Sequence, residues 1–189
     1  FASYYLTKEA SKNGLDISVL TTNANGKERL QIISNKFILL DGFKIKYYHE
    51  QWIKYFSFHL LFGLWKDLRS ADILHLQAVF SYPTPIALFF SFLLNKKVFF
   101  SVRGSLSKYS LQKGFFIKKL WLKFFIKPFV RKVFWHSTSN KEEKEIKSVF
   151  SNAKTYLISD GTYVNDIKSD KKENYIAALG RIHPVKGYD

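Results

Sequence analysis

Short apolar segments alternate with helix-forming segments along most of the chain, and this alternation limits the fold more than any other feature. Strands are predicted where apolar runs are brief and end near a turn, and helices where apolar residues recur at helical spacing. The predicted strands cover residues 15–22, 43–49, 72–76, 97–104, 133–139 and 154–161, and the predicted helices cover residues 1–13, 51–70, 85–94 and 140–150. This order predicts an α/β domain with a Rossmann-like, mostly parallel sheet, helices on both faces, and ligands at the carboxyl ends of the strands.

Composition changes near the carboxyl end divide the chain into three parts. Residues 1–164 form the predicted Rossmann-like domain, which we expect to lack its first strand because Phe1 is not a methionine and already lies in a helical pattern. Residues 165–174 are polar and charged, as in a linker. Residues 175–189 begin a new strand that has no helix to cover it. The sequence therefore predicts a second α/β domain that is truncated.

The formal net charge of +15 predicts an anionic partner, such as a phosphorylated substrate, a lipid surface or a nucleic acid. The cations are densest at residues 113–132, where they alternate with bulky apolar side chains in an amphipathic pattern. One predicted helical face carries Lys119, Lys123, Lys127 and Arg131, with Trp121 among the apolar residues. This pattern predicts contact with an anionic membrane surface, and the alternative is a domain helix with a solvated basic face and a buried apolar face.

Several kinds of site are excluded by residue content. The chain has no cysteine, which removes disulfides, thiolate nucleophiles and cysteine metal sites. No acidic pair stands at a predicted strand end, so no metal site is predicted. The apolar run at residues 79–94 is interrupted by Pro83 and Pro85 and is shorter than the roughly 18 residues of a membrane-spanning helix. No helix-turn-helix, zinc-finger or RNP-like pattern is present, so nucleic-acid binding is an alternative that rests on charge alone.

Polar residues follow two of the predicted strands at the edge where ligands bind in this fold class. His75 ends one strand, where an imidazole can hydrogen-bond a sugar hydroxyl or act as a base. Arg103, Gly104 and Ser105 end another, and the glycine permits a tight turn that aims its neighbours into the cleft. The alternative for His75 is a structural histidine with its hydrogen bonds made, and for Arg103 a surface salt bridge.

Four segments together resemble the retaining glycosyltransferase family 4, whose members have two facing Rossmann-like domains in the arrangement called GT-B. In chain order they are ADILHLQAVF, SVRGSLS, HSTSNKEEKEI and LGRIHPVKGYD. The last is the most specific, because Gly180-Arg181 is followed by Lys186-Gly187 at the family's spacing. The chain departs from the family at Gln77, where a second histidine is common, and at Arg103, where histidine is common. Since arginine does not shuttle protons near neutral pH, Arg103 would bind a phosphate or an acceptor carboxylate.

Two further pairs have local explanations. Ser139 and Glu142 match a helix capping box, and we assign them no chemistry. Asp160-Gly161 stands where the family has Asn-Gly beside the donor cleft, and the alternative is an ordinary turn.

The resemblance implies a hexosyltransferase that retains anomeric configuration and requires no metal ion or cofactor. Arg181 and Lys186 would stabilise the departing diphosphate, and Gly180 and Gly187 would let the backbone approach it. His75 would be the catalytic residue, with the Arg103, Gly104 and Ser105 turn and the Asp160-Gly161 turn lining the acceptor side or the cleft.

The same resemblance implies a nucleotide-sugar donor, linked to UDP or GDP, and a lipid-linked or polysaccharide acceptor of a bacterial cell envelope. We expect the protein to be cytoplasmic and peripheral at the inner face of the plasma membrane, with no nucleic-acid partner. The 189-residue chain is expected to be inactive because its donor domain is unfinished. The alternatives are a non-catalytic basic domain that binds a membrane or nucleic acid, and an inactive product of a broken gene.

Overall fold

The computed structural model describes residues 2–51 and 56–161. The chain divides into two units, Phe1–Ser159 and Asp160–Asp189. Of the second unit only Asp160 and Gly161 are among the described residues, so the predicted linker at 165–174 and the predicted second domain at 175–189 lie outside them. All the described helices and strands belong to the first unit.

Four parallel strands form the larger sheet of the first unit, in the order β6-β7-β8-β9. They are β6 (Ile73–Gln77), β7 (Lys97–Ser101), β8 (Val133–Ser137) and β9 (Lys154–Leu157). Each strand reaches the next through helical segments, among them α3 (Pro83–Leu93) and α6 (Asn140–Val149), because a parallel pair needs a crossover connection. The predicted α/β class and the predicted parallel pairing are confirmed for this sheet.

A smaller sheet holds three earlier strands, in the order β1-β5-β4. β1 (Ser18–Thr22) pairs in parallel with β5 (Phe43–Tyr48), whereas β4 (Phe37–Leu40) pairs antiparallel with β5. The sequence pattern did not predict β4. Its signal is Asp41-Gly42, a two-residue hairpin turn in which both residues have positive φ, 48° and 90°.

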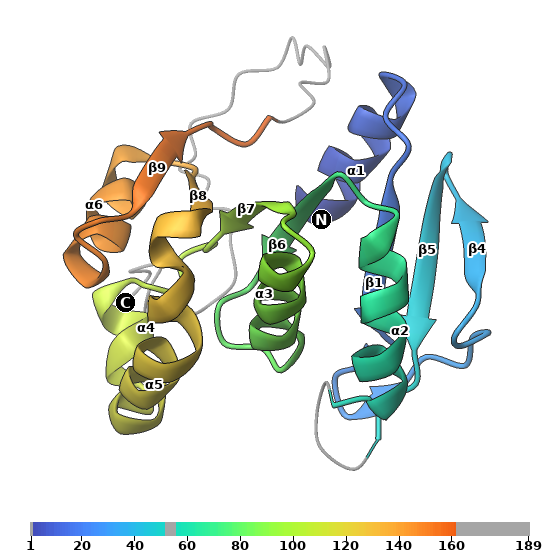
Figure 1. Ribbon diagram of the computed structural model, residues 1–189, viewed down its shortest axis with the longest axis horizontal. Helices are drawn as coiled ribbons and strands as arrows, with labels where there is room; N and C mark the ends of the chain where they lie inside the picture. Colours follow the sequence, from blue (N-terminus) through green and yellow to red (C-terminus); the bar gives the residue numbers. More distant parts are fainter. Residues whose placement is uncertain (1, 52–55, 162–189) are drawn as a thin grey trace, which may run out of the picture. The chain divides into compact units, whose positions relative to one another are not determined.

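No strand pairing joins the two sheets within the described residues. Figure 1 shows the order of strands across the first unit, from β4 through β5, β1, β6, β7 and β8 to β9. The single predicted sheet is therefore found as two, with an antiparallel strand at one edge. A separate small hairpin, β2 (Ala24–Asn25) with β3 (Glu28–Arg29), was also not predicted, while α1 (Ala2–Lys12) confirms the first predicted helix.

The hydrophobic core is densest where the middle strands of the larger sheet meet the helices. Phe100 of β7 and Trp135 of β8 are paired residues, both 0% exposed, and their ring centroids lie 5.0 Å apart in a stacked arrangement. Leu88 of α3 and Ile146 of α6 are buried in the same cluster. Removing these large apolar side chains from water stabilises the folded domain.

The helix α2 (Phe58–Arg69) packs closely against β5. It begins later than the predicted helix at 51–70, at the N-cap Ser57, whose Oγ accepts a hydrogen bond from the Leu60 N–H. Gly63 lies against the ring of Tyr48, and a Cβ at this position would be 2.6 Å from Tyr48 Cε1. Glycine is therefore the residue that lets helix and strand approach this closely.

The basic stretch is not one α-helix. α4 (Lys108–Gln112) and α5 (Phe115–Trp121) are followed by a π-helical segment (Leu122–Ile126) and a 3₁₀ segment (Lys127–Lys132), with Pro128 near the start of the last. The prediction that four cations follow one α-helical face is wrong beyond α5, because π and 3₁₀ turns hold different numbers of residues from an α-turn.

Candidate functional site

Two histidines and a serine form a hydrogen-bonded chain across the larger sheet, toward the carboxyl ends of its strands. His75 is the middle residue of β6, Ser101 the last of β7 and His136 the fourth of β8. His75 Nε2 lies 2.7 Å from Ser101 Oγ, which lies 2.6 Å from His136 Nδ1. His136 Nε2 lies 2.8 Å from the carbonyl oxygen of Ile158. Sequence reasoning found His75 and missed the other two, whose signal is their pairing in register on adjacent strands.

When His136 is neutral, the carbonyl of Ile158 sets the direction of this hydrogen-bond chain. A carbonyl oxygen only accepts, so His136 Nε2 carries the donated proton and, in the neutral ring, His136 Nδ1 is an acceptor. Ser101 therefore donates its hydroxyl hydrogen to His136 and accepts from the Nε2–H of His75. This assignment leaves the lone pair of His75 on Nδ1.

The environment of His75 favours its neutral form. Partial burial lowers the pKa of His75 below its ordinary value, and the positive charges of Arg103 and of His136 in its protonated form lower it further. The His75 side chain still retains exposure to solvent. At neutral pH His75 is thus an uncharged imidazole with an Nδ1 that can accept a proton or a hydrogen bond.

A left-handed turn follows β7 directly after Ser101. Arg103 and Gly104 have φ angles of 49° and 72°, and a positive φ is uncommon for arginine. The turn is closed by the Ser105 N–H, which donates to the Val102 carbonyl at 3.0 Å. Because Arg103 is charged and close enough to lower the pKa of His75, the structure brings these two predicted site residues into one electrostatic environment.

Glu142 holds this turn to the next strand end. Its carboxylate accepts the Gly104 N–H at 2.6 Å on Oε1, and on Oε2 it accepts the Thr138 N–H at 2.6 Å and the Thr138 hydroxyl at 2.9 Å. Glu142 itself is only 6% exposed, whereas its donors are not buried, since Thr138 is half-buried and Gly104 is exposed. The carboxylate thus joins the turn after β7 to the turn after β8.

The capping interpretation of this helix start is confirmed in part. Ser139 Oγ accepts the Glu142 N–H at 3.2 Å, as an N-cap does. The Glu142 carboxylate differs from a standard capping box, because it accepts the N–H of Thr138, one residue before the N-cap, and the N–H of Gly104, which lies 38 residues earlier in the chain. The sequence did not predict the hydrogen bond between Glu142 and Gly104, because the spacing of residues along a helix does not show contacts with distant parts of the chain.

The other predicted donor and cleft residues are not part of this hydrogen-bonded group within the described residues. Gly180, Arg181, Lys186 and Gly187 are outside the described residues. Asp160-Gly161 is exposed and belongs to the second unit.

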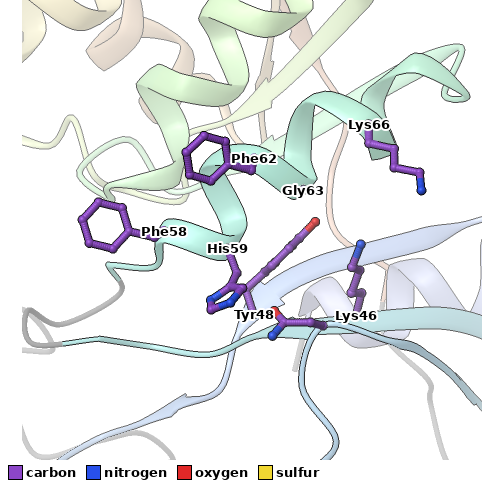
Figure 2. Close-up of a pocket in the computed structure, with 8 residues that line it drawn as sticks. Lys46, Tyr48, Phe58, His59, Phe62, Gly63 and Lys66 are labelled. Atoms are coloured by element: carbon purple, nitrogen blue, oxygen red, sulfur yellow. The ribbon is translucent and has the colours of Figure 1, made fainter.

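A separate hollow of about 480 Å³ lies between β5 and α2. Figure 2 shows residues that line it, Lys46 and Tyr48 on the strand and Phe58, His59, Phe62 and Lys66 on the helix, with His59 directed toward Tyr48. The Lys46 ammonium is already paired with the Asp67 carboxylate, Nζ to Oδ2 at 2.8 Å, and the Tyr48 hydroxyl also bonds that carboxylate. None of the predicted site residues lines this hollow.

Exposed aromatic and basic side chains gather on the segment from α5 to the 3₁₀ turn, which we term the basic–aromatic surface. Its apolar members are Phe116, Ile117, Leu120, Phe124 and Phe125, which are 46% to 79% exposed, and its basic members are Lys119, Lys123, Lys127 and Arg131, all exposed. Trp121 does not belong to it. The indole is half-buried and its Nε1–H donates to the Val79 carbonyl at 2.9 Å, so the predicted membrane role of Trp121 does not fit its position.

Within the described residues, no helix has both the length and the apolar character to cross a bilayer. In the same residues, no three or more histidine, aspartate or glutamate side chains group so that they could hold a metal ion. Comparison with protein-family models and with curated proteins finds no match to this chain.

Proposed function

We propose that this chain is the acceptor-side part of a glycosyltransferase that moves a sugar from a nucleotide-sugar to a lipid-linked or polysaccharide acceptor of a bacterial cell envelope. One observation carries the proposal: His75, hydrogen-bonded to Ser101 and in an environment that lowers its pKa, lies near the charge of Arg103 toward the carboxyl ends of a parallel sheet. Ligands of open α/β sheets bind at that edge. The assignment as a transferase comes from the four sequence segments that resemble glycosyltransferase family 4 and from their order along the chain.

The proposal gives each group a chemical task. His75 Nδ1 accepts a hydrogen bond from a substrate hydroxyl and orients it, while Arg103 attracts a phosphate or carboxylate of the acceptor. Arg181 and Lys186 neutralise the departing nucleoside diphosphate without a metal ion. The proposed architecture is a Rossmann-like domain at residues 1–164, a linker at 165–174 and the start of a donor domain at 175–189, as in GT-B enzymes.

The test is nucleoside diphosphate release by the full-length protein, with UDP- and GDP-sugars as donors and a lipid extract of bacterial membranes as acceptor. His75→Gln keeps a donor for Ser101 Oγ but removes the acceptor at Nδ1, so kcat/KM should fall about a hundredfold or more. His59→Gln, at an exposed histidine of α2, is the matched control and should retain parental activity. Release from no donor, or an unchanged rate for His75→Gln, would refute the proposal.

We further propose that the basic–aromatic surface holds the protein on an anionic membrane. Exposed phenylalanines close to lysines, such as Phe124 with the Lys123 ammonium 5.5 Å from its ring centroid, are costly to leave in water and fit the interfacial region of a bilayer. An anionic bilayer supplies both an apolar layer and negative charge, whereas a polynucleotide supplies negative charge without an apolar layer. This surface would bring the active site close to a lipid-linked acceptor.

Vesicle co-sedimentation tests the membrane contact. Changing Lys119, Lys123, Lys127 and Arg131 together to glutamine should weaken binding to phosphatidylglycerol vesicles at least about a hundredfold, since each surface cation contributes roughly 1 kcal/mol. A control with the same charge loss elsewhere, at exposed Lys97, Lys141, Lys144 and Lys154, should bind nearly as the parent does. Equal loss in both variants, or binding to single-stranded polynucleotides with none to vesicles, would overturn the membrane proposal.

A further inference from the structure

The hydrogen-bonded group of His75, Ser101 and His136 has two arrangements, which differ in the position of every shared hydrogen. With both rings neutral, His75 Nε2 donates to Ser101 Oγ, and Ser101 donates to His136 Nδ1. In the reversed arrangement His136 Nδ1 donates to Ser101, and Ser101 donates to His75 Nε2. The two distances between heavy atoms, 2.7 Å and 2.6 Å, suit a hydrogen bond in either direction.

The reversed arrangement contains one additional proton. His136 Nε2 keeps its hydrogen because it faces the Ile158 carbonyl oxygen at 2.8 Å, so a second hydrogen on Nδ1 makes this ring a cation. His75 Nε2 then accepts from Ser101, and the neutral His75 ring carries its hydrogen on Nδ1. The added proton thus changes His75 Nδ1 from an acceptor into a donor.

A proton that arrives at His75 Nδ1 can charge His136 while only hydrogens move. The Nδ1–H bond of His75 forms and its Nε2–H bond breaks. Ser101 Oγ takes that hydrogen and gives its own to His136 Nδ1. Within the group three bonds to hydrogen form and two break, which balances the one proton supplied. The positive charge passes between rings whose centroids lie 6.3 Å apart.

Hydrogen bonding and charge favour His136 over His75 as the ring that holds this charge. Both N–H groups of the His136 cation have an acceptor, Ser101 Oγ and the Ile158 carbonyl, which offsets the cost of charging a ring that is 9% exposed. On His75 a positive charge is opposed by partial burial and by the charge of Arg103. His75 Nδ1 also has no hydrogen-bond partner among the described residues.

Other titratable side chains near the two rings do not replace these partners. Arg103, after β7, acts on His75 through its charge. Glu142 of α6 is buried, and its oxygens accept from two backbone N–H groups and a hydroxyl, none of which belongs to a histidine. Tyr156 of β9 is the register partner of His136. The acceptors of the His136 ring are therefore Ser101 and the Ile158 carbonyl.

We propose that Ser101 and His136 form a proton path, which takes a proton from His75 Nδ1 into the sheet and holds it on His136. Ser101 and His136 are then positioning residues that act through His75. Because the charge rests on His136, His75 and Arg103 do not carry like charges near one another.

The path itself does not rest on the proposed function, whereas its use in sugar transfer does. In that use, the proton comes from the acceptor hydroxyl that His75 orients. The hydroxyl oxygen keeps the electron pair of its O–H bond and forms the new bond to the sugar. The nucleoside diphosphate leaves with the electron pair of the old bond.

Nitrogen-15 NMR of the histidine rings in the 189-residue chain tests the path, because it distinguishes the two neutral tautomers from the cation. The pH is lowered from about 8 to about 5, across the ordinary range of histidine. At the first protonation of the group, both nitrogens of His136 should carry hydrogen. His75 should stay neutral while its hydrogen moves from Nε2 to Nδ1. His59, which is exposed on α2, is the internal reference for direct protonation.

Two variants interrupt the path at different atoms. Ser101→Ala removes the oxygen that links the rings, so His75 should lose the tautomer change and pass directly from neutral ring to cation. His136→Asn keeps an oxygen that can accept from Ser101 but cannot hold the proton, so His75 itself should become charged. In the full-length protein, each variant should lower kcat/KM for diphosphate release about tenfold or more.

A His75 cation at the first protonation of the parent chain would overturn the proton path, and so would an unaltered tautomer change in Ser101→Ala. The parent titration decides by itself if a variant does not fold. Unchanged kcat/KM in both variants would overturn the use of the path in catalysis. The tautomer change without diphosphate release from any donor would refute the transferase and support the path. Diphosphate release with a His75 cation would refute the path alone.

Discussion

Replacing Glu142 with glutamine tests whether one buried carboxylate holds together the two turns at the carboxyl edge of the larger sheet. The two carboxylate oxygens accept from two backbone N–H groups, of Gly104 and Thr138, each at 2.6 Å. A glutamine amide offers one oxygen and one NH₂ group. One of the two N–H groups must therefore face another donor.

The expected loss of stability follows from these contacts. Gly104 is exposed and Thr138 is half-buried, so water can replace part of a lost hydrogen bond and the cost is smaller than for a fully buried N–H. Glu142→Gln should thus lower the free energy of unfolding by about 1–2 kcal/mol. Glu142→Ala leaves both N–H groups without this acceptor and should lower it by about 2–3 kcal/mol.

Urea unfolding, followed by tryptophan fluorescence and circular dichroism, measures both variants. Glu145→Gln makes the same chemical change on the same helix without a buried carboxylate network, and should stay within about 0.5 kcal/mol of the parent. Hydrogen exchange at the Gly104 amide gives a local reading, which should accelerate in Glu142→Gln. A stability loss no larger than that of Glu145→Gln would refute the assigned role.

Three further outcomes are expected. Gly63→Ala should destabilise the domain by about 1–3 kcal/mol, because its Cβ would overlap the Tyr48 ring, and an unchanged urea midpoint would contradict that close approach. In an NMR titration His75 should show a pKa below about 6.5, and this pKa should rise in His136→Asn. Because the pKa of His75 is lower in the folded chain, the unfolded chain binds the proton more readily. The contribution of neutral His75 to the free energy of unfolding is therefore complete above about pH 6.5 and is lost as the pH falls through the lowered pKa. Trp135→Ala should cost about 3–5 kcal/mol in urea unfolding, and a cost below about 1 kcal/mol would show that the core pairing is not as described.

Local patterns were enough to predict most helices and strands. The apolar run of β8 and the Ser139 cap of α6 are properties of short segments, and the structure confirms both. The Asp41-Gly42 hairpin has an equally local turn signal, but an alternation of strands and helices predicts parallel pairing and so gives no place to the antiparallel strand β4. The absence of a strand pairing between β1 and β6 in the described residues could not be predicted in this way, because packing of the whole domain and not any one segment decides which strands are neighbours.

For the candidate site, the sequence by itself determined that His75 lies on a strand and that the Arg103-Gly104 turn follows one, but the prediction that His75 ends its strand is wrong, because His75 is the middle residue of β6. Only the tertiary structure decided that Ser101 and His136 complete a hydrogen-bond chain with His75, and that Glu142 binds the turn after β7. The physical reason is register. Ser101 and His136 share a face because β7 and β8 pair at those two residues, and a slip of one residue would send the side chains to opposite faces. Long-range pairing of this kind is stabilised by the whole core, so no short stretch of sequence specifies it.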